Sequence, residues 1–231
     1  MTVANRPPLA YIRYVHAVTD AAALDFKFVD QIEYSPHYAN STYRTIGIYQ
    51  GVEAGNRQWK VFRNSTDINI AQQVVAEGTT NFVAGTRYTI LHRGTMASNS
   101  VVLITETLPT QDAGTHISVT NASMAAQDVF IGAPAGTPLF ANVATGTKTT
   151  YAARAALTTF TLHTAANGTL VSLASATPFV GLAGTETADP IGGYSVAGSQ
   201  MSAFLFAPGT GAAANSVSIV MDRQPPPTVP E

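Results

Sequence analysis

The chain has 231 residues, no cysteine, and a net charge of −2 from 12 Lys and Arg against 14 Asp and Glu. The missing cysteines exclude disulfides and thiolate metal sites, and the near-neutral charge argues against a nucleic-acid partner, which requires a basic patch. Charged residues make up only 11% of the chain, against about 25% in a typical soluble domain. This composition is typical of a secreted or periplasmic β-protein, or of a subunit whose surface is covered by neighbours.

No run of residues approaches the roughly 18 apolar positions that a membrane-spanning helix needs, so we expect no transmembrane segment. Residues 1–8 lack the apolar core of a secretory signal. From the composition we expect a periplasmic or extracellular location, with a cytoplasmic location left open.

The first half of the chain carries short extended segments separated by Gly, Asn, Ser or Pro turns. In the second of these segments, Leu24, Phe26 and Phe28 alternate with polar residues, which places three apolar side chains on one face of a strand. The predicted strands of this half lie at 11–18, 24–28, 59–62, 88–91 and 101–104. In the stretch 67–77, Asp67 is a candidate N-cap for one short helix.

The second half continues in the same style. Its predicted strands lie at 117–119, 129–131, 160–162, 203–206 and 217–220. Short strands at intervals set by turns indicate an all-β sandwich.

Motifs recur between the halves in an unbroken order. His16 corresponds to Asn121, Asp25 to Asp128, and the Asn-Ser-Val string at 99–101 to the one at 215–217, with offsets that drift between 102 and 116 residues. Drifting offsets in a constant order indicate duplication with loop insertions. We therefore predict two tandem antiparallel β-sandwich (Ig-like) domains related by internal duplication. They span residues 9–109 and 115–223, and a Pro-rich tail follows at 224–231.

Two strings of the first half resemble a known family. The string from Tyr14 to Phe26 resembles the opening of the bacterial family called domain of unknown function 4397, which has a strand, then His-Ala-Ser-Pro-Asp-Ala, then a second strand. Val18 and Thr19 stand here in place of Ser-Pro, and the second half lacks the His. The string from Gly85 to Thr89 resembles the family's Ala-Gly-x-x-Tyr-Thr segment. The resemblance implies exported, often duplicated, β-sandwich envelope proteins of bacteria, and it supplies no catalytic residues.

The histidines do not predict a metal cluster, because no two of the five have metal-ligand spacing along the sequence. His16 with Asp20 and Asp25 is the remaining combination for a metal or an acid–base pair. A histidine at a strand end more often donates a hydrogen bond to its own loop, and Asn121 at the corresponding place favours that role. We therefore predict no catalytic, cofactor or metal site.

A tyrosine-rich segment near residue 40 is the predicted partner-binding region. The span from Ile32 to Tyr49 covers 17 positions, whereas the corresponding span from Leu139 to Tyr151 covers 12. Tyrosine offers a large contact area at low entropic cost, and Asn and Ser add adaptable hydrogen bonds. A loop folded back on its own domain is the equal alternative. The candidate residues are Tyr34, His37, Tyr38, Asn40, Tyr43 and Arg44.

These features predict a non-enzymatic interaction module of the cell envelope, or a structural subunit of a larger bacterial assembly with a protein partner. The terminal tails and the tyrosine-rich segment are the expected contacts in such an assembly. A carbohydrate-binding or adhesive module with a glycan partner is the alternative, and an enzyme of unknown class is third.

Overall fold

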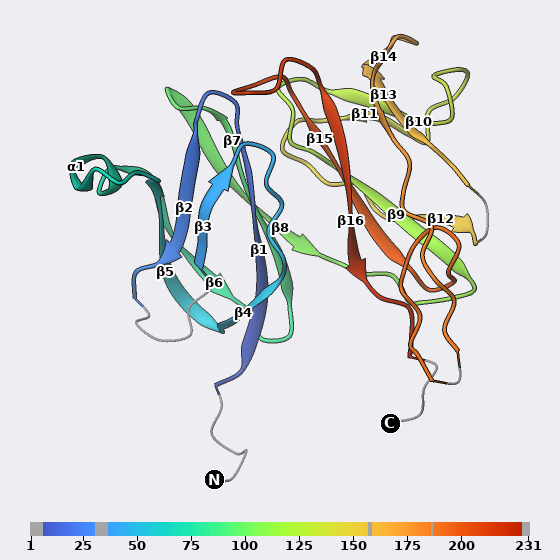
Figure 1. The fold of residues 1–231 in the computed structure, drawn as a ribbon, viewed down its shortest axis with the longest axis horizontal. Coiled ribbons are helices and arrows are strands. Elements are labelled where there is room, and N and C mark those ends of the chain that lie inside the picture. The colour runs from blue at the N-terminus through green and yellow to red at the C-terminus, as the bar shows by residue number, and fades with distance from the viewer. Residues whose placement is uncertain (1–6, 31–36, 157–158, 186, 228–231) are drawn as a thin grey trace. The chain divides into compact units, whose positions relative to one another are not determined.

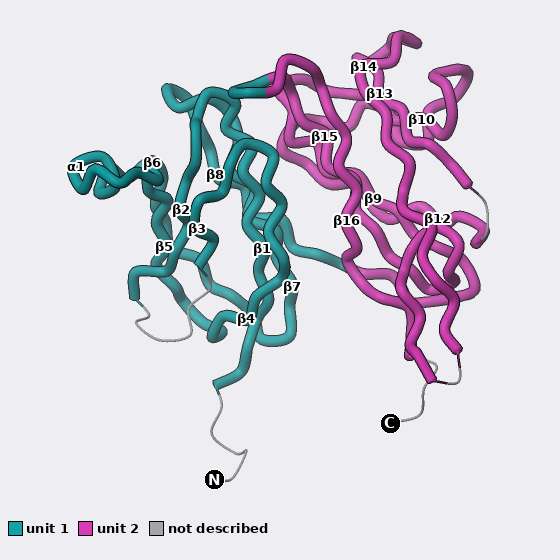
Figure 2. The backbone as a smooth tube through the Cα atoms, in the orientation of Figure 1, with its two compact units in different colours: residues 1–107, 209–211 teal, residues 108–208, 212–231 magenta. Residues whose placement is uncertain are grey.

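The computed structural model of the chain describes residues 7–30, 37–156, 159–185 and 187–227. The described residues form sixteen strands and one short helix, so the predicted all-β class is confirmed (Figure 1). The chain divides into two compact units, shown in Figure 2. Unit 1 comprises residues 1–107 and 209–211, and unit 2 comprises residues 108–208 and 212–231. No helix in the described residues is long and apolar enough to cross a membrane.

Unit 1 contains two four-stranded sheets, sheet A in the order β4-β1-β7-β8 and sheet B in the order β3-β2-β5-β6. The strands of sheet A are β1 (Leu9–Val18), β4 (Gln50–Glu53), β7 (Arg87–Thr95) and β8 (Ser98–Glu106). The strands of sheet B are β2 (Ala23–Phe28), β3 (His37–Thr42), β5 (Gly55–Arg63) and β6 (Val74–Phe82).

The two sheets of unit 1 share one core, as in a sandwich. Leu24, Phe26 and Phe28 of β2 are all buried, as their alternation predicts. They belong to the same buried cluster as Ile12 of β1 and Ile90 of β7. Both sheets therefore bury one face against the other.

The helix α1 (Ile68–Ala71) lies in the connection between β5 and β6. The predicted N-cap is confirmed, because the Asp67 side chain accepts a hydrogen bond of 2.9 Å from the Asn69 backbone N–H. This bond satisfies one of the free donors of the first helical turn.

Unit 2 also contains two four-stranded sheets, sheet C in the order β12-β9-β15-β16 and sheet D in the order β11-β10-β13-β14. The strands of sheet C are β9 (Gly114–Asn121), β12 (Ala152–Ala155), β15 (Gln200–Phe206) and β16 (Ser216–Arg223). The strands of sheet D are β10 (Gln127–Ile131), β11 (Phe140–Val143), β13 (Leu162–Ala166) and β14 (Ser172–Ala176). Each strand of unit 1 therefore has a counterpart at the same place in the strand order of unit 2.

Each unit departs from the predicted antiparallel arrangement at one pair of strands. β1 pairs with β7 in parallel, from Tyr11 opposite Arg87 to Val18 opposite Gly94. β9 and β15 form the corresponding parallel pair. Two parallel neighbouring strands cannot be joined by a tight turn. Between the two strands of each parallel pair, the chain forms the strands of the second sheet of the same unit. Local sequence patterns carry no signal for such a distant pairing.

A local distortion of the edge strand recurs in both units. In unit 1 the Asp25 carboxylate accepts a hydrogen bond of 2.7 Å from the backbone N–H of Asn40, whose φ is +49°. In unit 2 the Asp128 carboxylate accepts the same bond, at 2.6 Å, from Asn142, whose φ is also +49°. Asn tolerates this left-handed conformation better than most residues, and both strand pairs shift register beside the aspartate.

A buried carboxylate also recurs, on the last strand of each unit. Glu106 of β8 accepts a hydrogen bond of 2.5 Å from the Thr89 hydroxyl and one of 3.2 Å from Arg13. Asp222 of β16 accepts a hydrogen bond from Ser202, whose place in unit 2 corresponds to that of Thr89. The two units therefore agree in detail as well as in strand order.

Cutting the chain between Pro109 and Thr115 should give two fragments that each fold, because each unit has its own core. Circular dichroism and thermal melting of the separate fragments test this expectation. Fragments that are unfolded alone but fold when mixed would show that the units depend on a shared core.

Candidate binding site

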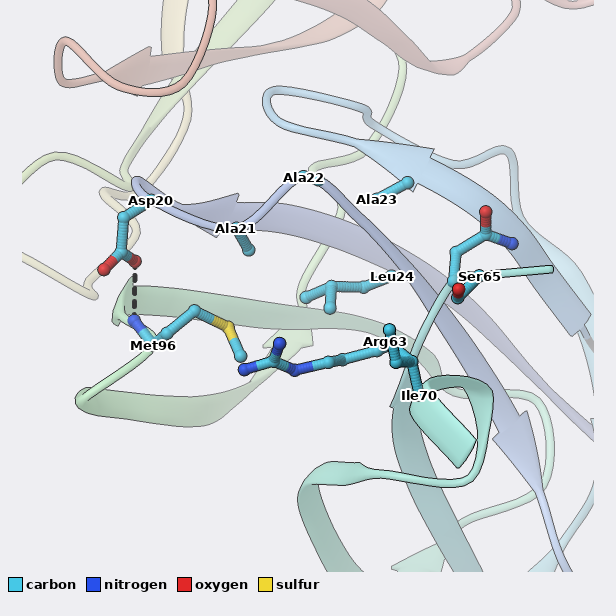
Figure 3. Close-up of a pocket in the computed structure, with 10 residues that line it drawn as sticks. Asp20, Ala21, Ala22, Ala23, Leu24, Arg63, Ser65, Ile70 and Met96 are labelled. Atoms are coloured by element: carbon cyan, nitrogen blue, oxygen red, sulfur yellow. Dashed lines mark hydrogen bonds between the residues drawn. The ribbon is translucent and has the colours of Figure 1, made fainter. Parts of the chain in front are cut away.

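A cavity of about 440 Å³ lies at one end of unit 1 (Figure 3). Three connections supply its walls: the turn between β1 and β2, the end of β5 with α1, and the hairpin between β7 and β8. Its size is within the range of small-molecule sites, roughly 300–1,000 Å³. The lining residues are Asp20, Ala21, Ala22, Ala23, Leu24, Arg63, Asn64, Ser65, Ile70 and Met96.

Asp20 joins two of these connections. Its carboxylate accepts a hydrogen bond of 2.6 Å from the backbone N–H of Met96 (Figure 3). The β1–β2 turn and the β7–β8 hairpin are thereby held together at the rim of the cavity. The Met96 side chain extends from this junction toward the guanidinium of Arg63.

Arg63 places a positive charge in a largely apolar part of the cavity. It is the last residue of β5 and pairs with Leu24, a core residue that is 1% exposed. Its side chain runs past Leu24 toward Met96 (Figure 3). Within the described ranges the Arg63 guanidinium forms neither a hydrogen bond nor an ion pair. Its five N–H donors are therefore available to a bound molecule.

Asn64 has a structural role beside the cavity. Its side-chain amide donates to the Asp25 carboxylate at 3.0 Å, and the same carboxylate accepts the backbone N–H of Asn40. Asp25 is therefore occupied in holding the middle of β3 and the residue that follows β5. Of the two side chains, Arg63 rather than Asn64 is the one free to bind a ligand.

A chain of hydrogen bonds runs from the core to the Met96 turn. The Tyr14 hydroxyl lies 2.9 Å from His92 Nδ1, His92 Nε2 lies 3.0 Å from Asn99 Oδ1, and Asn99 Nδ2 donates to the Met96 carbonyl. Because the Asn99 amide nitrogen donates to Met96, its oxygen accepts from His92. His92 therefore carries its proton on Nε2, and its Nδ1 accepts from Tyr14.

His16 lies fully buried next to His92, with 6.5 Å between the ring centroids. Burial lowers the pKa of His16, and the Thr42 backbone opposes this effect more weakly. Neither ring nitrogen of His16 meets hydrogen-bond geometry with a partner in the described part of the chain. The structure gives His16 a polar interaction with the Thr42 backbone of β3, and the predicted hydrogen bond to the turn after β1 is not seen among the described residues.

The predicted combination of His16 with Asp20 and Asp25 is not assembled into one site. Asp20 bonds to Met96, and Asp25 bonds to Asn40 and Asn64. Across residues 7–30, 37–156, 159–185 and 187–227, no three His, Asp or Glu side chains are placed to hold a metal ion.

The predicted partner-binding residues are dispersed, and one of them is a core residue. Tyr34 lies outside the described residues. His37 and Asn40 are exposed on β3. Tyr38 is only 7% exposed, and its hydroxyl donates to the carbonyls of Ile12 at 2.6 Å and Ile48 at 2.9 Å. The prediction for Tyr38 as a partner contact is corrected, because this side chain points into the sandwich.

Tyr43 and Arg44 pack near the buried histidine. The half-buried Tyr43 ring meets His16 edge-on, with 6.2 Å between centroids, and the Arg44 guanidinium lies 5.2 Å from the centre of the Tyr43 ring. Burial raises the pKa of Tyr43, and Arg44 opposes this shift. Arg44 has a φ of +74°, and its backbone N–H donates to the His16 carbonyl at 2.8 Å. This part of the segment folds back on its own unit.

Sequence reasoning missed Arg63 and Met96 as residues of the cavity. Arg63 lies at the end of a strand and Met96 in a short turn, and no sequence motif marks either place as part of a binding site.

The two units have the same order of strands, and each is a sandwich of two four-stranded sheets. This architecture defines the class of protein to which the chain belongs.

The family model described as Domain of unknown function (DUF4397) matches residues 10–132, which is more than half of the chain. The chain belongs to this family, as the strings near Tyr14 and Gly85 predict. A comparison with curated proteins finds no match.

Replacing Tyr38 with Phe should lower the free energy of unfolding by about 1–3 kcal/mol, because the buried Ile12 carbonyl and the partly buried Ile48 carbonyl lose this hydroxyl as a donor. Chemical denaturation measures this change. Tyr11→Phe is the control, since Tyr11 is 41% exposed on β1 and its variant should match the wild type. Unchanged stability with a loss of partner binding would instead restore Tyr38 as a partner contact.

The buried His92 should make the chain less stable in acid. Burial lowers the pKa of His92 to about 4, with smaller effects from Asn99 and the neighbouring His16. The unfolded chain takes up this proton near pH 6.5, so the stabilising contribution is complete above that pH and is lost as the pH falls toward 4. The loss should reach about 3 kcal/mol.

Urea denaturation between pH 7.5 and pH 4, on the wild type and on His92→Gln, measures this dependence. The variant should show a shallower loss of stability with acid, although His16 still contributes in the same direction. Parallel pH profiles for the two proteins would contradict the assignment to His92.

Proposed function

We propose that this chain is a non-enzymatic interaction module of the bacterial cell envelope, which binds a protein partner or serves as a subunit of a larger assembly. Its membership of the DUF4397 family, which implies an exported envelope protein of bacteria, supports the periplasmic or extracellular location. The observation that carries the proposal is a set of exposed apolar side chains on unit 2.

These side chains belong to a stretch of the unit 2 sequence with few charges. From residue 155 to residue 199 the sequence contains only two charged residues, Glu186 and Asp189. The same stretch exposes seven large apolar side chains. They are Leu170 (60%), Val171 (72%), Leu173 (37%), Phe179 (43%), Val180 (55%), Leu182 (64%) and Ile191 (55%). They form two groups, with Leu170, Val171 and Leu173 around the β13–β14 turn and the other four in the connection between β14 and β15. We call the seven residues of both groups together the apolar surface of unit 2.

The apolar surface of unit 2 has the composition of a protein interface. Interface centres are depleted in charge, and exposed groups of apolar side chains mark interaction sites. Val171 lies in the turn before β14, and Leu182 lies in the long connection between β14 and β15, where its backbone pairs with Ile191. This pairing holds the backbone at Leu182, which favours a preformed contact at that position.

The buried carboxylates support a structural rather than a catalytic use of the polar residues. Glu106 is bonded to Thr89 and Arg13, and Asp222 accepts from Ser202 and from Tyr151 at 2.6 Å. Groups held in this way stabilise the sheets that carry them.

The proposal includes the internal duplication predicted from the sequence. It is supported by the equal strand order of the two units and by the matching Asp25–Asn40 and Asp128–Asn142 bonds. Duplication provides two copies of the sandwich that can take different roles.

A photo-crosslinking side chain at Val171 or at Leu182 tests the proposed function in the source cell. Both positions should give protein crosslinks that are absent when the same group replaces Thr79, an exposed residue of β6. Val171→Lys together with Leu182→Lys should reduce the native mass of the complex. If the protein is monomeric in native extracts and crosslinks equally from all three positions, the proposal is wrong.

A further inference from the structure

The end of unit 2 that corresponds to the cavity of unit 1 has different side chains. In unit 2 this end is filled by a polar network of three side chains. Gln127 donates to the Ser123 hydroxyl at 2.8 Å, Ser123 donates to Asn121 Oδ1 at 2.6 Å, and Asn121 donates to the Val143 carbonyl at 2.7 Å. All three side chains are buried and bonded to each other or to the backbone.

The residues at the corresponding positions of unit 1 cannot build this network. Since Asp25 corresponds to Asp128, Leu24 takes the place of Gln127. His16 takes the place of Asn121. Nine positions separate His16 from Asp25, whereas seven separate Asn121 from Asp128, so the turn of unit 1 is two residues longer. The longer turn contains Asp20 and the alanines that line the cavity.

The charged residue of the cavity is also specific to unit 1. Arg63 pairs with Leu24, and its counterpart Ala166 pairs with Gln127. The connection after Arg63 runs over residues 64–73 and contains α1, whereas the connection after Ala166 covers only residues 167–171. The longer connection supplies Ile70 to the cavity wall.

We propose that this cavity binds a small molecule that carries a carboxylate together with a hydrogen-bond donor. The carboxylate binds the unpartnered guanidinium of Arg63, and the body of the ligand lies against Leu24, Ile70 and Met96. The inference goes beyond the proposed function, because it concerns unit 1 and a small ligand.

The chemistry of the lining residues selects this class of ligand. A guanidinium presents paired N–H donors that match the two oxygens of a carboxylate. Asp20, at the other side of the cavity (Figure 3), accepts from a hydroxyl or an ammonium group. Leu24, Ile70 and Met96 provide apolar contact for the carbon skeleton. Both a sugar acid and an amino acid satisfy these three requirements.

Methionine methyl NMR on the full chain tests the proposal. The chain has five methionines. Met96 lines the cavity, while the fully buried Met201 of unit 2 serves as an internal reference. D-glucuronate and L-leucine are titrated separately, with glucose and L-leucinamide as controls that lack the carboxylate. At least one acid should shift the Met96 signal in a saturable way, leave Met201 unchanged, and bind better than its control.

Charge variants assign the binding to Arg63. Arg63→Gln should weaken binding of the acid at least tenfold, and Arg63→Lys should weaken it less, since it keeps the charge but loses the paired donors. Arg223→Gln removes an exposed arginine of unit 2 and should leave binding unchanged. Melting curves check that each variant is folded.

The pattern of responses separates the two sources of the carboxylate. A response to glucuronate alone identifies a sugar acid, and a response to leucine alone identifies an amino acid; either one supports the proposal. The proposal is overturned if neither acid gives a saturable Met96 shift, if the controls bind equally well, or if Arg63→Gln binds as the wild type does. None of these results bears on the crosslinks from the apolar surface of unit 2.

Discussion

The parallel pairing of β1 with β7 is the constraint on which the rest of unit 1 depends. It places Tyr14 and His16 of the first strand beside His92 of a strand that is distant in sequence. The strand after β7 then returns through the Met96 turn, which the Asn99 side chain ties back to His92. The parallel pair therefore holds the buried polar chain and the rim of the cavity in one arrangement.

The two units have different side chains at this end of the sandwich. Unit 2 places Asn121, Ser123 and Gln127 there, with hydrogen bonds from Gln127 to Ser123 and from Ser123 to Asn121. Unit 1 places His16 and Leu24 there and leaves a cavity at the surface. Unit 1 lacks this polar network, and Arg63 lines the cavity at this end of the sandwich.

The low charge of the chain has different consequences in its two units. In unit 2 few charges accompany the exposed apolar side chains from Leu170 to Ile191, so few charged groups would lose water when a partner covers them. In unit 1 some of the charged side chains lie at defined structural positions. Arg13 and Glu106 form a buried ion pair of 3.2 Å, and Arg63 stands at the cavity. Recognition in the two units would accordingly rest on different physical effects, apolar contact in unit 2 and charge in unit 1.

The sequence by itself determined the all-β class, the inward face of Leu24, Phe26 and Phe28, the cap at Asp67, and the family. Each of these depends on residues that are close together in the chain, where side-chain periodicity and turn chemistry act directly. Only the tertiary structure decided the parallel strand pairs, the burial of Tyr38 and the cavity at Arg63. These features arise where segments distant in sequence meet. The tyrosine-rich composition near residue 40 is compatible with a surface loop and with a core, and the position of the Tyr38 hydroxyl beneath two backbone carbonyls is fixed only when the sheets pack.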